Sequence, residues 1–396
     1  MSGAPRVYLD HAATSPVRAE VRAAVDALLA EPVGNPSSLH WAGRAARVHL
    51  ETARAQVAAL LAPAARPDEV VFTSGGTEAN HLALRGLLPG ARRAHLAVAA
   101  VEHSSVLGAA RALERGGARV EQLPVDRAGV LDLEALQGAL ARGAALVSVA
   151  AGNNELGTVQ PLAEIAALCA AAGALFHADA VQAAGWVGVG LGGPGRAPGP
   201  DALTLSAHKL GGLPGTGALV VRHGVALAPL LEGGDQERGL RGGTPALAGI
   251  VAFGTAARLA AAERAEAGAR VAALRRRLEE GVRAAVAGAV VHGAAAERLP
   301  HISCFGFAGA RGELVLLNLD LEGIAASAGS ACVAGRTEPS HVLRALGLGP
   351  AAARGAVRTS LGRASSAEEI DRVLAVLPTV VERVRRAAPD PDENSA

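Results

Sequence analysis

The sequence has 396 residues, of which 50% are apolar and 2% aromatic, and its formal net charge is +1. This length predicts two domains, or one large α/β domain with a smaller one attached, and the near-neutral charge gives no support to direct nucleic-acid binding. The first residues lack an apolar signal segment and no apolar run reaches membrane-spanning length, so we expect a cytoplasmic protein with no membrane contact.

Strand and helix patterns alternate through the first half of the chain. A short strand and turn near 8–16 come first, and a dense turn containing Asn35 separates helices near 18–30 and 40–61. An apolar strand at 70–73 follows, with further strands near 95–100, 119–123, 145–151, 174–178, 202–206 and 217–222, and helices near 104–115, 132–141 and 161–172. This alternation predicts βαβ units and a mostly parallel sheet.

The second half begins with a helical, Ala- and Arg-rich stretch from about 245 to 288, either one long helix or two in series. Short strands near 289–292, 301–307 and 355–360 then alternate with helices near 311–319, 338–346 and 366–387, which predicts a compact α+β unit. We therefore expect a large domain over 15–260, a small domain built from 1–14 and 261–388, and a disordered tail over 389–396.

The sequence contains three cysteines, Cys169, Cys304 and Cys332. An odd number with no close pair argues against a disulfide framework and a zinc site, so no metal is expected. Cys169 falls in an amphipathic helical pattern and Cys304 in a strand pattern, so both are predicted to be buried. Cys332 lies among small residues that could pack little core, a composition that suits a loop carrying a nucleophile.

An apolar strand ending near Thr73 runs through two glycines, Gly75 and Gly76, into a helical pattern. Such a turn presents backbone N–H groups and a helix N-terminus to an anion, and Thr77 adds a hydroxyl. The spacing does not match the Walker pattern, which argues against a nucleoside triphosphate. Alone, this turn is weak evidence for a phosphate site.

Lys209 is the only lysine in the chain, whereas the other 37 of its 38 basic residues are arginines. A lysine amine can form a Schiff base and a guanidinium cannot. Ser206 and His208 end an apolar strand just before Lys209, and a Gly-rich loop follows. One hypothesis is a lysine that holds pyridoxal 5'-phosphate (PLP), with Ser206 and His208 offered to its phosphate. The alternative is a codon bias that spared one ordinary lysine.

Other polar residues follow predicted strands, at the edge where ligands bind in parallel sheets. PLP needs a carboxylate that keeps its pyridine nitrogen protonated, and Asp179 is the candidate. Gln182 is placed to bond the phenolic oxygen. His103 is the best available partner for the ring face, because the chain has so few aromatic residues.

The motifs that carry a family resemblance run along nearly the whole chain: YLDHAAT, GNPSS, FTSGGTEAN, EHSSV, NNELGTVQP, HADAVQ, SAHK, RGGTP, SAGSAC, EPSHVLRALG and VRTSLGR. Together they resemble the cysteine desulfurase family of the NifS/IscS type, in the class V aminotransferase branch of PLP fold-type I enzymes. The resemblance implies a large domain with a mostly parallel seven-stranded sheet between helices, plus a smaller α+β domain. It also implies a homodimer that converts L-cysteine to L-alanine and leaves a persulfide on Cys332. An iron–sulfur scaffold or a sulfur-carrier protein would then take the sulfur, for iron–sulfur clusters or tRNA thiolation.

The resemblance also assigns roles to single residues. Lys209 carries the cofactor, His103 stacks on its ring and takes part in proton transfer, and Cys332 is the nucleophile. The phosphate is held by Gly76, Thr77, Ser206, His208 and Thr244 of the partner subunit. Asn154 and Gln182 contact the ring oxygen and Asp179 the ring nitrogen, while Asn35, Asn154 and Arg358 bind the substrate.

Two positions depart from the family pattern, because Asp235 and Gly243 stand where Gly and Ser are expected. The spacing from Cys332 to Arg358 matches the long-loop subgroup, which favours sulfur transfer to scaffold or carrier proteins. A class V aminotransferase, a selenocysteine lyase and a non-catalytic scaffold for sulfur-transfer machinery are the alternatives.

Overall fold

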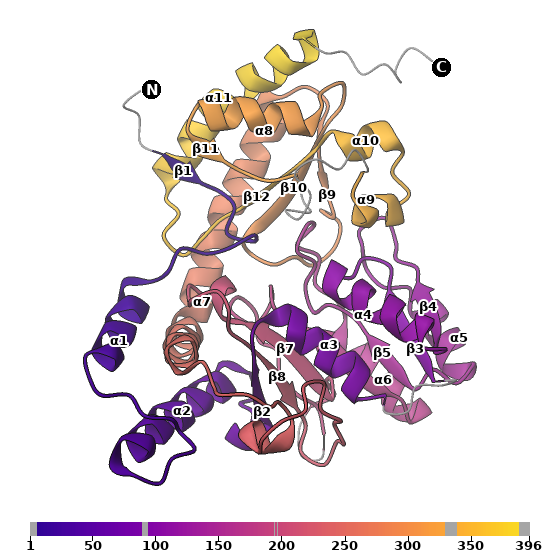
Figure 1. The fold of residues 1–396 in the computed structure, drawn as a ribbon. Helices are drawn as coiled ribbons and strands as arrows, with labels where there is room; N and C mark the ends of the chain where they lie inside the picture. The colour runs from indigo at the N-terminus through magenta and orange to yellow at the C-terminus, as the bar shows by residue number, and fades with distance from the viewer. Residues whose placement is uncertain (1–5, 89–93, 194, 196, 329–338, 388–396) are drawn as a thin grey trace.

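The computed structural model describes residues 6–88, 94–193, 195, 197–328 and 339–387 (Figure 1). The strands are β1 (Val7–Tyr8), β2 (Val70–Thr73), β3 (His95–Ala99), β4 (Arg119–Leu123), β5 (Leu146–Ser148), β6 (Leu175–Asp179), β7 (Ala202–Ser206), β8 (Gly217–Val221), β9 (Ala289–His292), β10 (Ile302–Phe307), β11 (Ile324–Ala325) and β12 (Ala356–Ser360). The helices are α1 (Ala19–Leu29), α2 (Trp41–Leu60), α3 (Gly76–Gly86), α4 (Ser104–Arg115), α5 (Leu133–Ala141), α6 (Leu162–Ala172), α7 (Leu247–Ala285), α8 (Gly312–Leu321), α9 (His341–Ala345), α10 (Pro350–Arg354) and α11 (Ala367–Ala387).

A seven-stranded sheet forms the larger part of the molecule, in the order β2-β8-β7-β6-β5-β3-β4. β8 runs antiparallel to both β2 and β7, and the other neighbours are parallel. The predicted mostly parallel seven-stranded sheet is therefore confirmed. Parallel neighbours direct their carboxyl ends to one edge, so residues following β3, β5, β6 and β7 are brought together there.

Apolar side chains alternate between the two faces of this sheet, as the two-residue period of a strand requires. Phe72 and Val147 belong to one buried cluster, with Phe253 of α7. Val71 and Val98 belong to a second cluster on the opposite face, with Leu82 of α3. Because both faces are covered by helices, the strands of this sheet other than the edge strand β4 consist of nearly continuous buried residues.

The long helix α7 joins this layer to a second core. Its first turns pack in the large cluster through Ile250 and Phe253, and its later turns pack with Phe305 of β10 through Val271 and Leu278. Figure 1 shows α7 running from the large sheet to the region of β9, β10 and β12, which form an antiparallel sheet. The stretch expected as one helix or two is thus a single helix. The domain boundaries given above stay a prediction.

None of the helices formed by the described residues combines the length and the apolar character needed to cross a membrane.

His177 on β6 lies entirely inside the sheet. Its Nδ1 is 2.9 Å from the Ser148 hydroxyl and its Nε2 is 3.0 Å from the Thr204 hydroxyl, so it bridges to both neighbouring strands. Burial lowers the pKa of His177 to about 4, against the opposing effect of the Asp179 charge. The folded protein therefore holds this imidazole neutral at physiological pH.

We expect this histidine to make the protein less stable as the pH falls from about 6.5 towards 4. The unfolded chain takes up a proton near the ordinary pKa, whereas the folded chain does not, so the free energy of unfolding falls by ~1.4 kcal/mol per pH unit for this group. Urea unfolding at several pH values checks this against His177→Gln, which keeps a donor and an acceptor but cannot titrate. Parallel pH dependences for the two proteins would contradict the expectation.

Candidate active site

Lys209 lies at the carboxyl edge of the large sheet, in the short 3-10 helix η2 (Ala207–Lys209) that follows β7. Its Nζ donates to the carbonyl oxygens of Ala12 and Ala13, at 2.7 and 2.6 Å. Gln182 Nε2 donates to the same Ala12 carbonyl at 2.8 Å. The turn after β1 thus brings together two residues that the sequence assigned to one site.

Asp179 ends β6 with its side chain almost fully buried. Its Oδ1 accepts the backbone N–H of Val181 at 3.0 Å, and its Oδ2 accepts Nδ2 of Asn80 at 2.7 Å. These contacts fix the orientation of the carboxylate at the sheet edge. A carboxylate held in this way is suited to pairing with a protonated ring nitrogen.

A hydrogen-bonded chain runs from Asp179 to His103, the residue that caps α4. Asn80 Nδ2 also donates to the Ser105 hydroxyl at 2.8 Å, and this hydroxyl is 2.7 Å from His103 Nδ1. Because the backbone N–H of Ser105 donates to His103 Nδ1 at 3.2 Å, this nitrogen acts as an acceptor, and the neutral ring carries its proton on Nε2. Burial lowers the pKa of His103, the Asp179 charge opposes the shift, and the Lys209 charge adds to it.

The contacts of Asn80 and Ser105 with Asp179 and His103 were not predicted from the sequence. Asn80 belongs to α3, three and four residues before the buried Ala83 and Leu84, so its polar side chain lies on the apolar face of an amphipathic helix. A buried asparagine in that position signals a polar partner inside the fold. That signal was available in the sequence, although it does not identify Asp179 as the partner.

Glu102, beside His103, is completely buried. Its Oε1 accepts the backbone N–H of Ala150 at 2.6 Å, and its carbonyl oxygen is 2.9 Å from Nε2 of His341. Burial raises the pKa of Glu102 well above the ordinary carboxyl value, and the Asp179 charge adds to this effect. Through these two contacts Glu102 joins the ends of two strands to α9.

Residues 74–78, at the junction of β2 and α3, form the turn predicted to bind phosphate and are called the phosphate turn below. This turn packs directly against the ends of β6 and β7. A Cβ added at Gly76 would lie 3.0 Å from Cγ2 of Val181 and 3.6 Å from Cβ of Ser206. The first turn of α3, with Thr77, therefore lies beside Ser206. His208 Nδ1 is 3.1 Å from the Thr14 hydroxyl, and burial together with the Lys209 charge lowers the His208 pKa to about 4.

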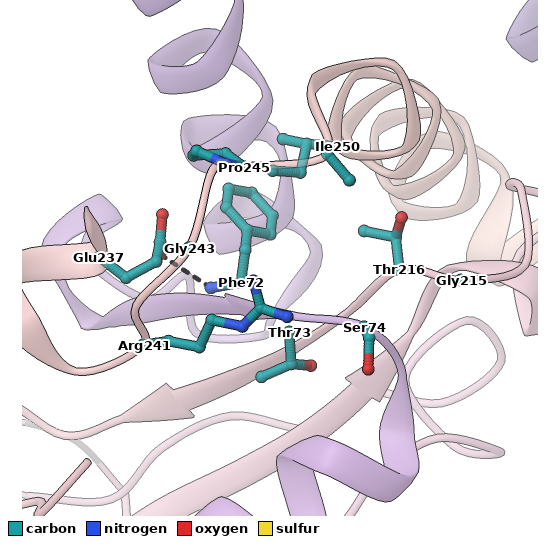
Figure 2. A pocket seen from close by; sticks show the side chains of 11 residues that line it. Phe72, Thr73, Ser74, Gly215, Thr216, Glu237, Arg241, Gly243, Pro245 and Ile250 are labelled. Atoms are coloured by element: carbon teal, nitrogen blue, oxygen red, sulfur yellow. Dashed lines mark hydrogen bonds between the residues drawn. The ribbon is translucent and has the colours of Figure 1, made fainter. Parts of the chain in front are cut away.

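Thr244 lies on the exposed loop before α7, and its side chain is exposed in this single chain. Its neighbours Gly243 and Pro245 line a small pocket together with Ser74 of the phosphate turn (Figure 2). The loop that carries Thr244 therefore lies close to the phosphate turn of its own chain.

Arg358 reaches the site from β12 and is almost fully buried. Its Nη1 donates to the carbonyl oxygen of Asn154 at 2.9 Å, and its Nη2 is 2.8 Å from Oδ1 of Asp10. The predicted substrate residues Arg358 and Asn154 are thus in contact. Asn35 lies on the exposed loop before α2, where its Oδ1 accepts the backbone N–H of Ser37 at 2.9 Å, and its part in the site stays a prediction.

Cys169 and Cys304 are buried, as predicted. Burial raises the pKa of each thiol to about 12, so neither forms a thiolate near neutral pH. Cys332 lies outside the described residues.

The donor set of this edge fits PLP. A helix N-terminus with Thr77 and Ser206 suits a phosphate, the oriented carboxylate of Asp179 suits a ring nitrogen, and the amine of Lys209 lies between polar groups at the same edge. The residues expected to hold the cofactor come from strands and helices far apart in the sequence. A mostly parallel seven-stranded sheet with this set at one edge defines an enzyme of PLP fold-type I.

Comparison with known proteins agrees with this class. The sequence profile described as "Aminotransferase class-V" matches residues 7–373, and the chain belongs to this family of PLP-dependent enzymes. A protein of Cereibacter sphaeroides named "Cysteine desulfurase" is 46% identical over 386 residues, covering 97% of this chain and 98% of that protein. A solved structure named "NIFS-LIKE PROTEIN" superposes with a TM-score of 0.87 at 33% identity, covering 96% of this chain and 100% of the other. A structure described as "SspA in complex with cysteine" has a TM-score of 0.77 at 32% identity and covers 90% of this chain and 98% of its own.

Proposed function

We propose that this protein is a PLP-dependent cysteine desulfurase that converts L-cysteine to L-alanine and collects the sulfur as a persulfide on Cys332. The observation that carries the proposal is the meeting of Lys209 and Gln182 on the carbonyl of Ala12, beside the oriented carboxylate of Asp179. Near full-length similarity to a named cysteine desulfurase supports the choice among class V reactions.

PLP bound at this edge supplies an electron sink for negative charge that develops at the substrate α-carbon. Lys209 would hold the cofactor through its amine, and its Nζ, when free, would take the proton from the substrate α-carbon. Asp179 holds the proton on the ring nitrogen, and Gln182 with Asn154 orients the ring oxygen. Thr77, Ser206 and His208 would bind the phosphate, together with Gly76 at the start of α3.

We assign His103 to the ring face and to proton transfer. The hydrogen bonds from Asn80 to Ser105 and from Ser105 to His103 fix His103 Nδ1 as an acceptor, so the proton available to the site is on His103 Nε2. The lowered pKa keeps the ring neutral near pH 7, which allows it to exchange a proton with the substrate rather than hold a permanent charge.

In the proposed sulfur transfer the Cys332 thiolate attacks the sulfur of cysteine. A sulfur–sulfur bond forms, the carbon–sulfur bond breaks with its electron pair left on carbon, and protonation of that carbon gives alanine. Cys169 and Cys304 do not compete for this role, because burial raises their pKa to about 12.

Replacing Arg358 should weaken cysteine binding more than cofactor binding. We assign Arg358 to the substrate carboxylate, and the loss of such a charge-assisted contact costs about 1.5–3 kcal/mol. Arg358→Ala should therefore raise the KM for cysteine by roughly 10- to 100-fold. Initial rates over a range of cysteine concentrations measure this, and the absorbance of lysine-bound PLP tests whether the cofactor is retained.

Arg358→Lys is the matched control, because it keeps the charge and loses the planar fork. It should give a KM between the wild-type and alanine values. An unchanged KM in Arg358→Ala would remove this residue from the substrate site.

We further propose a homodimer in which Thr244 of the partner subunit completes each phosphate site. The acceptor of the persulfide would be an iron–sulfur scaffold or a sulfur-carrier protein, serving cluster assembly or tRNA thiolation. A cytoplasmic location accords with this chemistry, because a reducing compartment keeps a catalytic thiol out of stable disulfides.

The direct test is to incubate the purified, PLP-loaded protein with L-cysteine and a thiol reductant. Alanine and sulfide should appear in equal amounts. When a keto acid is added as amino acceptor, mercaptopyruvate formed together with the aminated keto acid would instead indicate an aminotransferase. Turnover of selenocysteine without turnover of cysteine would indicate a selenocysteine lyase.

A further inference from the structure

The turn before Thr244 has an unusual backbone. Glu237 and Arg238, within the 3-10 turn η3 (Gln236–Gly239), have φ values of 47° and 59°. Residues with a side chain rarely adopt this left-handed region, and they persist there only where the surroundings hold them, often next to functional sites. This turn must therefore be held by its surroundings, and it precedes the loop that carries Thr244.

Buried contacts hold this turn against β2. The Glu237 carboxylate accepts Nη1 and Nη2 of Arg54 at 2.7 and 2.8 Å, and it also accepts the backbone N–H of Phe72 at 2.8 Å. Arg238 Nη2 donates to the carbonyl oxygen of Val70 at 2.8 Å. Figure 2 shows the Glu237–Phe72 contact beside the pocket. The turn is thus fixed to the strand that leads into the phosphate turn.

A second contact joins the same segment to the phosphate turn itself. Arg241 Nε and Nη2 donate to the two carboxylate oxygens of Glu78, at 2.9 and 3.3 Å, and the Glu78 carboxylate accepts the backbone N–H of Ser74 at 2.8 Å. Burial alone would raise the pKa of Glu78, but hydrogen bonds from Arg241 and Ser74 lower it, so the pair stays ionised near neutral pH. Figure 2 shows Arg241 on the side of the pocket that carries Glu237 and Gly243.

Short, constrained backbone connects Arg241 to Thr244. Gly242 donates to the carbonyl oxygen of Leu231 at 2.9 Å, and Gly243, with φ 101°, donates to Oε1 of Gln236 at 3.2 Å. Arg241 is therefore the last side chain before Thr244 that is fixed to the body of the subunit. Thr244 itself is exposed, as a residue that serves another subunit must be.

We propose that Arg241, through its ion pair with Glu78, is a positioning residue that sets Thr244 for the cofactor phosphate of the partner subunit. This inference rests on the proposed function, which includes the dimer and the assignment of Thr244. Because Glu78 belongs to the phosphate turn of its own chain, the ion pair links one phosphate site to the residue lent to the other. Cofactor retention in one subunit then depends on an arginine of its partner.

Mixed dimers separate an effect in the same subunit from an effect in the partner. Two differently tagged subunits are co-expressed, and one of them carries Lys209→Ala. Lysine-bound PLP then forms only in the subunit that keeps Lys209, and this is called the remaining site. In the first dimer the remaining site is in a subunit with Arg241→Ala, facing a Lys209→Ala partner with Arg241 intact. In the second, Arg241→Ala and Lys209→Ala are in the same subunit, and the remaining site is in an otherwise wild-type subunit.

The measurement is the rate at which absorbance of lysine-bound PLP is lost after dilution into a PLP-scavenging solution. The Arg241→Ala homodimer should lose PLP roughly five- to tenfold faster than wild type, the lower end of typical coupling between sites. The first mixed dimer should retain PLP as well as a Lys209→Ala/wild-type dimer, and the second should lose it as fast as the Arg241→Ala homodimer. The same pair of dimers made with Thr244→Ala provides the matched control and should give the same pattern.

Fast loss in the first mixed dimer and slow loss in the second would overturn the proposal, because Arg241 would then act on its own subunit. Wild-type retention in the Arg241→Ala homodimer would overturn it as well. Should Arg241→Ala fail to dimerise, Arg241→Lys, which keeps the charge but loses the two-atom contact, is compared in the same dimers. No turnover is measured, so a protein that retains PLP but fails to desulfurate cysteine would refute the proposed function and leave this test intact.

Discussion

Lys209→Ala should abolish covalent PLP binding and reduce turnover by roughly 10³-fold or more, the scale expected when a covalent catalytic group is removed. The chain contains no other lysine, so no neighbouring ε-amine can take over the linkage. Absorbance of lysine-bound PLP and borohydride reduction followed by mass spectrometry measure the loss. A mutant that still carries a reducible PLP adduct would contradict the assignment.

Lys209→Arg is the control for charge and shape at this position. The guanidinium keeps a positive charge and can still donate to the carbonyl oxygens of Ala12 and Ala13, but it does not form a Schiff base. It should therefore fold as well as wild type and be as inactive as the alanine variant. Substantial activity in Lys209→Arg would show that the amine is dispensable.

The large sheet, and the gathering of candidate site residues at one of its edges, were predictable from the sequence for the same physical reason. Strands buried on both faces read as short apolar runs, and the residues that follow them gather at one edge of a parallel sheet. Asp179 and Ser206 end such runs, and Lys209 follows one. Because the sheet is regular, residues that follow its parallel strands in the sequence lie close together in the fold.

Side-chain contacts between separate layers of the fold could not be predicted from the sequence by the same reasoning. Asn80 and Asp179 are 99 residues apart, and Arg358 and Asp10 are 348 residues apart, yet both pairs are in contact. The periodicity of α3 indicates that Asn80 is buried, but it does not identify the side chain opposite. Side-chain partners across layers are determined by crossing angles and register, which a single sequence does not encode in any local pattern.

The raised pKa of Glu102 is a further feature that a sequence pattern does not reveal. A glutamate that follows a strand looks like an ionised member of a polar cluster. In the fold it is completely buried close to the Asp179 charge, and both effects raise its pKa well above the ordinary carboxyl value. Burial and a nearby like charge, neither of which is visible in the sequence, decide its protonation.

Cys332→Ala should still bind PLP through Lys209 but should release little alanine from cysteine and carry no persulfide. The proposed mechanism gives this thiol one task, attack on the substrate sulfur, which follows the binding of substrate and removal of its α-proton. Spectral changes on adding cysteine should therefore persist in the mutant. Alanine release and persulfide content, measured in a single turnover and by mass spectrometry, should both fall far below wild type.

Cys169→Ala and Cys304→Ala are the matched controls, because each removes a thiol that is buried and has a pKa raised to about 12. Both should keep persulfide formation, at some cost in stability from the lost packing. An aminotransferase would be indifferent to the loss of Cys332, since its half-reactions use no protein thiol. A selenocysteine lyase would keep its activity towards selenocysteine, whose selenol leaves more readily without a nucleophile. Alanine production from cysteine at the wild-type rate in Cys332→Ala would refute the proposed sulfur transfer, because the two remaining thiols are held in their unreactive protonated form.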